Sequence, residues 1–173
     1  EVLKISPFDS NFLLKFGAVY LKNNRVLEDQ PLQCGDLLRV HTRPRRFHRK
    51  VDWSSFILTE FADYILIRKP AGLPCHSTVD NLKENVLFQL TQFLQRPLFL
   101  THRLDIPTSG ILVFAKSVEA QSQFNKDLED SKVEKIYTAY INGIGPKPGL
   151  YEHHMLNSPR APKVVQTDPA ENT

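Results

Sequence analysis

The stretch THRLDIPTSGILVFAK, residues 101–116, joins a polar loop to a run of apolar residues. The apolar run over 110–116 predicts a β-strand, and a shorter run over 98–100 predicts a second strand ahead of the loop. Catalytic groups concentrate in loops that rigid strands hold in place. Asp105 is the carboxylate of this loop, and it is a candidate nucleophile or general base. An aspartate before Ile-Pro-Thr is also typical of a turn, so both interpretations stay open.

Helices and strands follow one another irregularly on both sides of this loop. Asn81 and Glu84 form a capping-box pattern, which predicts the start of a helix. Apolar periodicity predicts two strands and two helices, in the order strand 64–67, helix 82–95, helix 117–129 and strand 133–142. The regular strand–helix–strand repeat of a parallel fold is missing. The sequence therefore predicts an α+β fold with a mixed, mainly antiparallel sheet.

The first 45 residues form a separate pattern of short elements. A helix is expected around Phe12–Leu14, and extended segments follow it, with turn chemistry at Asn23-Asn24. A new apolar pattern begins near Trp53. We therefore predict a small α/β module over 1–45, a basic linker over 46–52 and a larger domain over 53–173.

Basic residues are concentrated around this linker. The net charge of the chain is +3, but residues 1–50 hold ten basic and five acidic side chains. Half of the residues from 39 to 50 are basic, namely Arg39, Arg43, Arg45, Arg46, Arg49 and Lys50. Such a cluster either binds a polyanion or keeps a linker soluble through its charge. The excess of arginine over lysine favours RNA as the polyanion, because guanidinium groups bind phosphates in a bidentate manner.

The overall composition sets the expected compartment and partners. Hydrophobic residues make up 41% of the chain, and no apolar run approaches the roughly 18 residues that cross a bilayer. We expect no membrane partner and, by default, a monomer. Two cysteines, Cys34 and Cys75, favour a reducing compartment, and no secretion signal is present. The expected location is the cytoplasm, with a mitochondrion or plastid as the alternative if a presequence preceded Glu1.

Other polar side chains give weaker indications of a site. Cys75, His76 and His102 form neither a supported nucleophile pair nor a large enough ligand set for a metal. The adjacent His153 and His154 are more typical of a solvent-exposed loop than of a shared ion. We therefore expect no metal site.

Three motifs, in the same order, resemble those of one known family. Residues 102–116, with the pattern HRLDxxTSG, are similar to the signature of the RluA-type RNA pseudouridine synthases. Residues 67–76 (IRKPAGLPCH) resemble the lysine–proline motif of that family, which leads from a strand into a loop. Residues 135–139 (KIYTA) resemble its lysine-x-tyrosine-x-alanine strand, and Tyr137 follows Asp105 at a spacing consistent with the family.

The resemblance implies an isomerase that converts uridine to pseudouridine in structured RNA, with rRNA ahead of tRNA, and that needs no cofactor. It implies that Asp105 is the catalytic aspartate, which attacks the ribose or the uracil ring or assists proton loss at the sugar. It further implies that Tyr137 stacks on the target uracil and that Arg103 lies by the flipped nucleotide and helps to hold the opened helix. Residues 17–41 are similar to the S4-like RNA-binding module often fused upstream, so the 1–45 module is expected to bind RNA.

One family feature has no counterpart here. Members continue with further strands and a motif of the type glycine-arginine-x-histidine-glutamine, whose arginine pairs with the catalytic aspartate. The last arginine of this chain is Arg160, and nothing after it matches that motif. The sequence is therefore expected to be either a fragment of a longer enzyme or a non-catalytic RNA-binding derivative that acts in ribosome assembly. The ending at Glu171-Asn172-Thr173, without a terminating element, favours a domain that is incomplete at its C-terminus.

Overall fold

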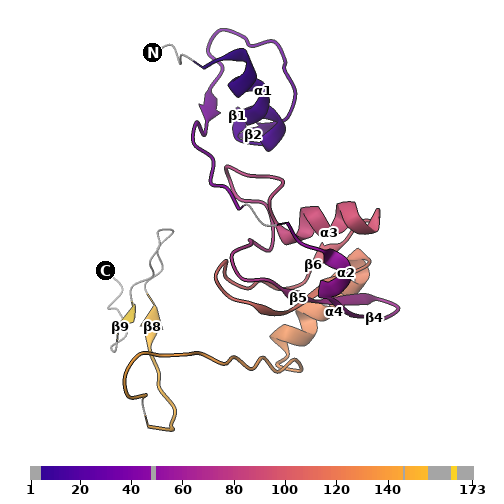
Figure 1. Ribbon diagram of the computed structural model, residues 1–173, viewed down its shortest axis with the longest axis vertical. Coiled ribbons are helices and arrows are strands. Elements are labelled where there is room, and N and C mark those ends of the chain that lie inside the picture. Colours follow the sequence, from indigo (N-terminus) through magenta and orange to yellow (C-terminus); the bar gives the residue numbers. More distant parts are fainter. Residues whose placement is uncertain (1–4, 48–49, 146, 156–164, 167–173) are drawn as a thin grey trace. The chain divides into compact units, whose positions relative to one another are not determined.

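The computed structural model describes residues 5–47, 50–145, 147–155 and 165–166, and the chain forms two compact units, 1–134 and 135–173. The first unit contains α1 (Pro7–Phe16), β1 (Val19–Leu21), β2 (Asn24–Val26), β3 (Leu38–Val40), α2 (Trp53–Phe56), β4 (Ile57–Glu60), β5 (Tyr64–Lys69), α3 (Val86–Leu94), β6 (Phe99–Leu100), β7 (Gly110–Ala115) and α4 (Val118–Glu129) (Figure 1). The second contains β8 (His154–Met155) and β9 (Val165–Gln166), paired antiparallel. Within these described ranges no helix is both long and apolar enough to span a bilayer.

Residues 5–45, called the N-terminal module below, form one helix and a three-stranded antiparallel sheet. Helix α1 begins at Ser6, whose hydroxyl accepts a hydrogen bond from the Asp9 N–H, and it ends at Gly17, which has a left-handed φ of +75°. The sheet order is β2-β1-β3. Leu13 on the helix packs with Ala18 and Val19 in a small core of its own.

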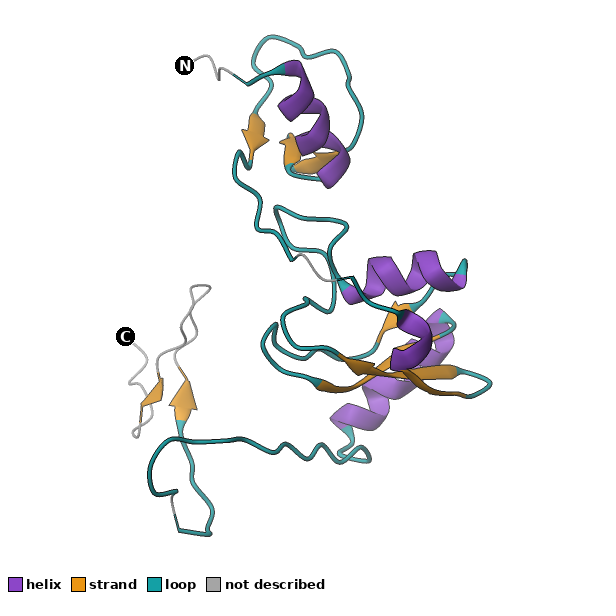
Figure 2. Cartoon of the chain, in the orientation of Figure 1, coloured by secondary structure: helices purple, strands orange, loops and turns teal. Residues whose placement is uncertain are grey.

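The larger part of the first unit is built on a four-stranded antiparallel sheet with the order β4-β5-β7-β6 (Figure 2). Strands β5 and β7 pair over six residues each, so that Ile65 lies opposite Phe114 and Ile67 opposite Leu112. These four side chains are fully buried. They form the centre of the main hydrophobic core.

Helices α3 and α4 cover opposite faces of this sheet. Val86 and Leu90 of α3 are fully buried in the cluster that contains Ile65 and Ile67. Alternate residues of a strand point to opposite faces, so Tyr64 points away from that cluster. Its hydroxyl donates to the carbonyl of Ala120 on α4 at 3.0 Å. The strands that frame the 101–109 loop are thus fixed from both sides.

Most of the predicted elements are confirmed. The fold is α+β with antiparallel sheets, and α4 begins one residue after the predicted helix start at 117. Helix α3 begins at Val86 rather than at residue 82, because Asn85 supplies the N-cap. The strand predicted over 133–142 is wrong: these described residues form no strand, since all their apolar side chains except that of Val133 are exposed and no described strand pairs with them. The predicted boundary at 46–52 lies inside the first unit and stays a prediction.

Replacing Asn85 with alanine is expected to destabilise the first unit by about 1–2 kcal/mol. The Asn85 side chain accepts from the Phe88 N–H at 2.9 Å and donates to the Leu82 carbonyl at 2.7 Å, and the residue is 1% exposed. The measurement is the urea midpoint of unfolding, with Asn125→Ala on the exposed surface of α4 as the matched control. Equal midpoints for the two variants would contradict the assignment of Asn85 as the cap.

Candidate active site

The loop that carries Asp105 connects two paired strands, β6 and β7. Its start is pinned to β7, because the Thr101 hydroxyl donates to the Val113 carbonyl at 2.7 Å and the Val113 N–H donates to His102 Nε2 at 3.3 Å. The Thr108 N–H donates to the Asp105 carbonyl at 3.1 Å, so Asp105 does open a turn. The residue is nevertheless exposed. The turn therefore presents the carboxylate to solvent from a rigid base.

Lys69, the last residue of β5, supports this turn through hydrogen bonds from its side chain. The residue is fully buried, and its ammonium donates to four backbone carbonyls, those of Pro70, Asp105, Ile106 and Thr108, at 2.8–3.2 Å. A buried charge is tolerated where hydrogen bonds satisfy it. The sequence analysis gave Lys69 no role, although the lysine–proline motif contains it. The structure assigns it the support of the Asp105 loop.

Cys75 holds the loop from a second direction. Its thiol donates to the Leu104 carbonyl and accepts from the Leu104 N–H, both at 3.2 Å. Burial raises the pKa of the Cys75 thiol, which therefore stays neutral at physiological pH. A neutral, hydrogen-bonded thiol is a structural group. In the described residues no three His, Cys, Asp or Glu side chains are placed to hold a metal ion.

The positively charged Arg103 lies two residues before Asp105 and is also exposed. Arg103 and Asp105 are exposed, whereas the intervening Leu104 is half-buried against the core. Burial lowers the pKa of the nearby His76, and the charge of Arg103 lowers it further. Within the described part of the chain neither Arg103 nor Asp105 forms an ion pair. The site thus offers an accessible carboxylate and an accessible guanidinium on one loop.

Comparison with known proteins identifies the family of this chain. A family model described as RNA pseudouridylate synthase matches residues 63–172, which include the Asp105 loop, Lys69 and Cys75. The chain belongs to this family.

Relatives of this chain include a plant, a bacterial and a human protein. The chain is 34% identical over 145 residues to "RNA pseudouridine synthase 6, chloroplastic" of Arabidopsis thaliana, covering 81% of this chain and 30% of the relative. It is 35% identical over 154 residues to "Ribosomal large subunit pseudouridine synthase D" of Neisseria meningitidis serogroup B, covering 84% and 41%. A solved structure of "Human RNA Pseudouridylate Synthase Domain Containing 4" matches at 30% identity, with a TM-score of 0.39, over 46% of this chain and 31% of that one. The chain spans less than half the length of each of these relatives.

Tyr137, the predicted partner of the uracil, lies in the second compact unit of the chain. Its side chain is exposed, as are those of the neighbouring Ile136 and Tyr140. The predicted role of Tyr137 stays a prediction.

The predicted RNA-binding residues of this family member fall into two groups. Arg39, Arg43 and Lys50 are exposed, and the Arg39 guanidinium lies 4.4 Å from the centre of the Tyr20 ring. Arg45 and Arg46 are also exposed, but they bind the carboxylates of Asp80 and Glu84. Arg49 lies outside the described residues. The sequence did not distinguish these groups, because the carboxylates lie 35 and 38 residues away in the chain.

Proposed function

We propose that this chain carries the catalytic aspartate of an RNA pseudouridine synthase and that the whole protein isomerises uridines in structured RNA. The observation that carries the proposal is the Asp105 loop: an exposed carboxylate on a turn that Lys69 and Cys75 hold, inside the segment that matches the family. The activity is that of an isomerase, because the product differs from the substrate only in which atom of the base is joined to the ribose.

The reaction breaks the bond between the ribose carbon and N1 of uracil and forms a bond from the same carbon to C5. The hydrogen on C5 leaves to solvent, and N1 gains a proton, so atoms and charge balance without a cofactor. In the proposal, the Asp105 carboxylate supplies the required nucleophile or base, by attacking the ribose or the ring or by taking a proton from the sugar. An exposed position suits this role, because the target nucleotide must reach the carboxylate from outside.

Access to a paired uridine requires that the base leave its helix. Extrusion costs a few kcal/mol, and stacking on an aromatic ring returns roughly 1–3 kcal/mol per base. In the proposal, Tyr137 supplies that ring, and the exposed guanidinium of Arg103 contacts the phosphate of the flipped nucleotide. Both side chains are exposed, so a ligand can reach them from solvent.

The N-terminal module and the linker after it are proposed to bind the RNA backbone outside the site. Arg39, Arg43 and Lys50 are exposed cations, and Arg49 belongs to the same basic stretch. We propose rRNA as the substrate ahead of tRNA, since the Neisseria relative is named for the ribosomal large subunit. The name of the Arabidopsis relative supports a plastid as the alternative to a cytoplasmic location. A monomer remains the proposed state.

Release of tritium from RNA that contains 5-tritiated uridine tests the proposed function. The assay compares this chain with any longer form of the protein. Release by the chain itself supports the complete proposal, and release by a longer form alone means that further segments complete the site. If neither form releases tritium although RNA is still bound, the result would favour the non-catalytic RNA-binding alternative.

Replacing Arg43 with alanine is expected to weaken RNA binding in a manner that depends on salt. Loss of one phosphate contact lowers the magnitude of the slope of log K against log salt concentration by about one. The measurement is fluorescence anisotropy of a labelled stem-loop RNA at several salt concentrations, with Lys126→Ala on α4 as the control. An unchanged slope would contradict a phosphate contact at Arg43.

A further inference from the structure

Residues 78–84, called the docking loop here, belong to the larger part of the first unit and form hydrogen bonds with the N-terminal module. The Tyr20 hydroxyl donates to the Val79 carbonyl at 2.8 Å, and Arg25 donates to the Thr78 carbonyl at 2.6 Å. The docking loop also donates a hydrogen bond to the module, from the Leu82 N–H to the carbonyl of Phe16 at the end of α1, at 2.8 Å. These bonds join residues about 60 positions apart into one interface.

The backbones approach closely at this interface. A Cβ atom on Gly17 would lie 2.8 Å from the Cβ of Leu82, a separation that real Cβ atoms essentially never show. The left-handed φ of Gly17 also disfavours any other residue there. The module is therefore seated against the docking loop by shape as well as by hydrogen bonds.

Arg45, whose own side chain is exposed, forms an ion pair of the interface with a buried carboxylate. Its guanidinium donates to Asp80 through Nη2 at 2.9 Å and Nε at 3.1 Å, and its backbone N–H donates to the same carboxylate at 2.8 Å. The Asp80 side chain is 8% exposed. Burial alone would raise the pKa of Asp80, but the hydrogen bonds from Arg45 and Thr78 outweigh it and hold the pKa well below its usual range.

Arg46 forms a second pair beside the first. Its guanidinium donates to Glu84 at 2.8 and 3.0 Å, and the Phe47 N–H donates to the other oxygen at 2.6 Å. The same guanidinium lies 4.9 Å from the centre of the Phe16 ring on α1. Arg46 thus links α1, the linker and the docking loop.

We propose that Arg45 and Arg46 are positioning residues, which hold the N-terminal module at a fixed place relative to the Asp105 loop, and that they do not bind RNA phosphates. A phosphate that captured Arg45 would leave the buried Asp80 carboxylate without its cation, which is strongly unfavourable. The fixed placement sets where an RNA bound by the module presents a uridine. The fixed placement of the module rests on the contacts alone. Its effect on where the RNA presents a uridine rests on the proposed function.

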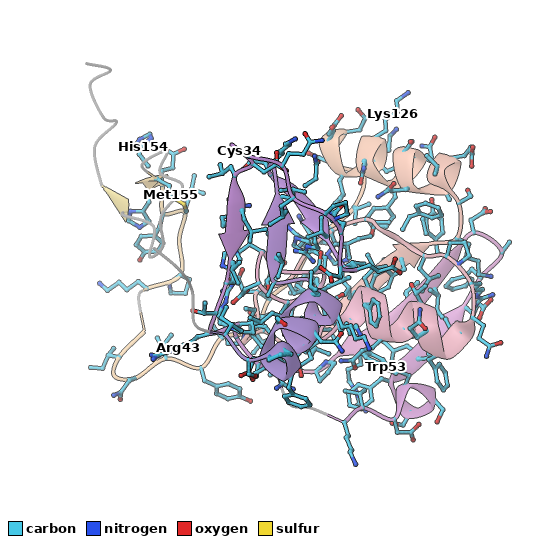
Figure 3. All side chains as sticks on the ribbon, turned by 90° about the horizontal axis from the view of Figure 1, so that it is seen from above. Cys34, Arg43, Trp53, Lys126, His154 and Met155 are labelled. Carbon is cyan, nitrogen blue, oxygen red and sulfur yellow. The ribbon has the colours of Figure 1, made fainter. Side chains whose placement is uncertain are left out.

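The first test measures the distance between the module and the larger part of the unit. Spin labels are placed at Lys15→Cys on α1 and Lys126→Cys on α4, in a Cys34→Ser background, and double electron–electron resonance gives the distance distribution. Figure 3 labels Lys126 and Cys34. Cys75 is 3% exposed and stays unlabelled. We expect one narrow distribution, which the near-isosteric pair Asp80→Asn and Glu84→Gln broadens at least twofold. Arg43→Ala is the matched control and leaves the width unchanged.

An unchanged width in the Asp80→Asn, Glu84→Gln double variant would overturn the proposal. Circular dichroism verifies that each labelled variant is folded. If that double variant does not fold, Arg45→Lys with Arg46→Lys replaces it, because lysine keeps the charge but cannot form the two-nitrogen contact with a carboxylate. This measurement involves no RNA and no turnover, so its result is independent of the proposed function.

The second test separates positioning from phosphate binding. The labelled stem-loop RNA is titrated at several salt concentrations with the Arg45→Ala, Arg46→Ala double variant. Positioning predicts a slope within half a unit of the wild-type value, whereas two lost phosphate contacts would lower its magnitude by about two and overturn the proposal. In a form that releases tritium, the Asp80→Asn, Glu84→Gln variant is expected to lose about 10- to 100-fold in kcat, with less than a twofold change in RNA affinity. Full activity in that variant would also count against positioning.

Discussion

Replacing Asp105 with asparagine is expected to abolish pseudouridine formation while leaving the fold and RNA binding intact. Asparagine keeps the shape of the side chain but supplies neither a nucleophile nor a base, so the expected loss is at least about 10⁴-fold. Asp105 is exposed and makes no ion pair within the described residues, so stability should change by no more than about 0.5 kcal/mol. The measurement is single-turnover tritium release, in the shortest form of the protein that is active.

Asp63→Asn is the matched control for this experiment. Asp63 is also an exposed aspartate next to a strand of the same sheet, but it lies outside the 101–109 loop. It should retain full activity. Pseudouridine formation by the Asp105→Asn variant at the wild-type rate would refute the catalytic assignment, whatever the control does.

Replacing Lys69 with methionine is expected to destabilise the first unit by about 3–5 kcal/mol. Methionine fills most of the space of the lysine stem, but it leaves the carbonyls of Asp105, Ile106 and Thr108 without the ammonium that now binds them. The loop should then loosen before the whole unit unfolds. Hydrogen exchange reports this directly, because the Gly72 N–H donates to the Ile106 carbonyl at 2.7 Å and the Thr108 N–H to that of Asp105.

Lys126→Met is the control, since Lys126 lies on the exposed surface of α4. The urea midpoint and the exchange rates of the two amides are compared for both variants and the wild type. Unchanged protection of Gly72 and Thr108 in the Lys69 variant would mean that the ammonium does not support the loop. Where methionine prevents folding, Lys69→Arg keeps the charge and tests the same amides.

The sequence analysis predicted elements well where local signals act alone. Helix α4 has Ser117 as its N-cap and Ala120 on its buried side, and both signals lie within a few residues of each other. For α3 the predicted start was four residues early. Asn81 and Glu84 do hydrogen bond to each other, at 3.0 Å, but Glu84 also binds Arg46 and the Phe47 N–H, so this pattern builds a loop between distant segments. A local pattern cannot reveal a partner 38 residues away.

The candidate site shows the same division. The placement of Asp105 in a loop between two strands follows from apolar runs on either side of it, and the structure agrees. The support from Lys69 could not be predicted, because the loop atoms that it binds are backbone carbonyls 36 to 39 residues later, and every residue type carries a backbone carbonyl. The basic cluster likewise has a uniform sequence, although carboxylates from another segment bind Arg45 and Arg46 among its five members that the structure describes.

The docking loop also bears on how such a protein can evolve. Its partners on the N-terminal module are Phe16, Tyr20, Arg25 and Arg45, while the loop itself belongs to the stretch that leads into α3. A recombination event that exchanged the module alone would pair a new helix end with the old Leu82 and would leave Asp80 facing a foreign side chain. The two segments must therefore be inherited together. A chimera of two relatives is expected to fold when the N-terminal module and residues 78–84 come from the same parent.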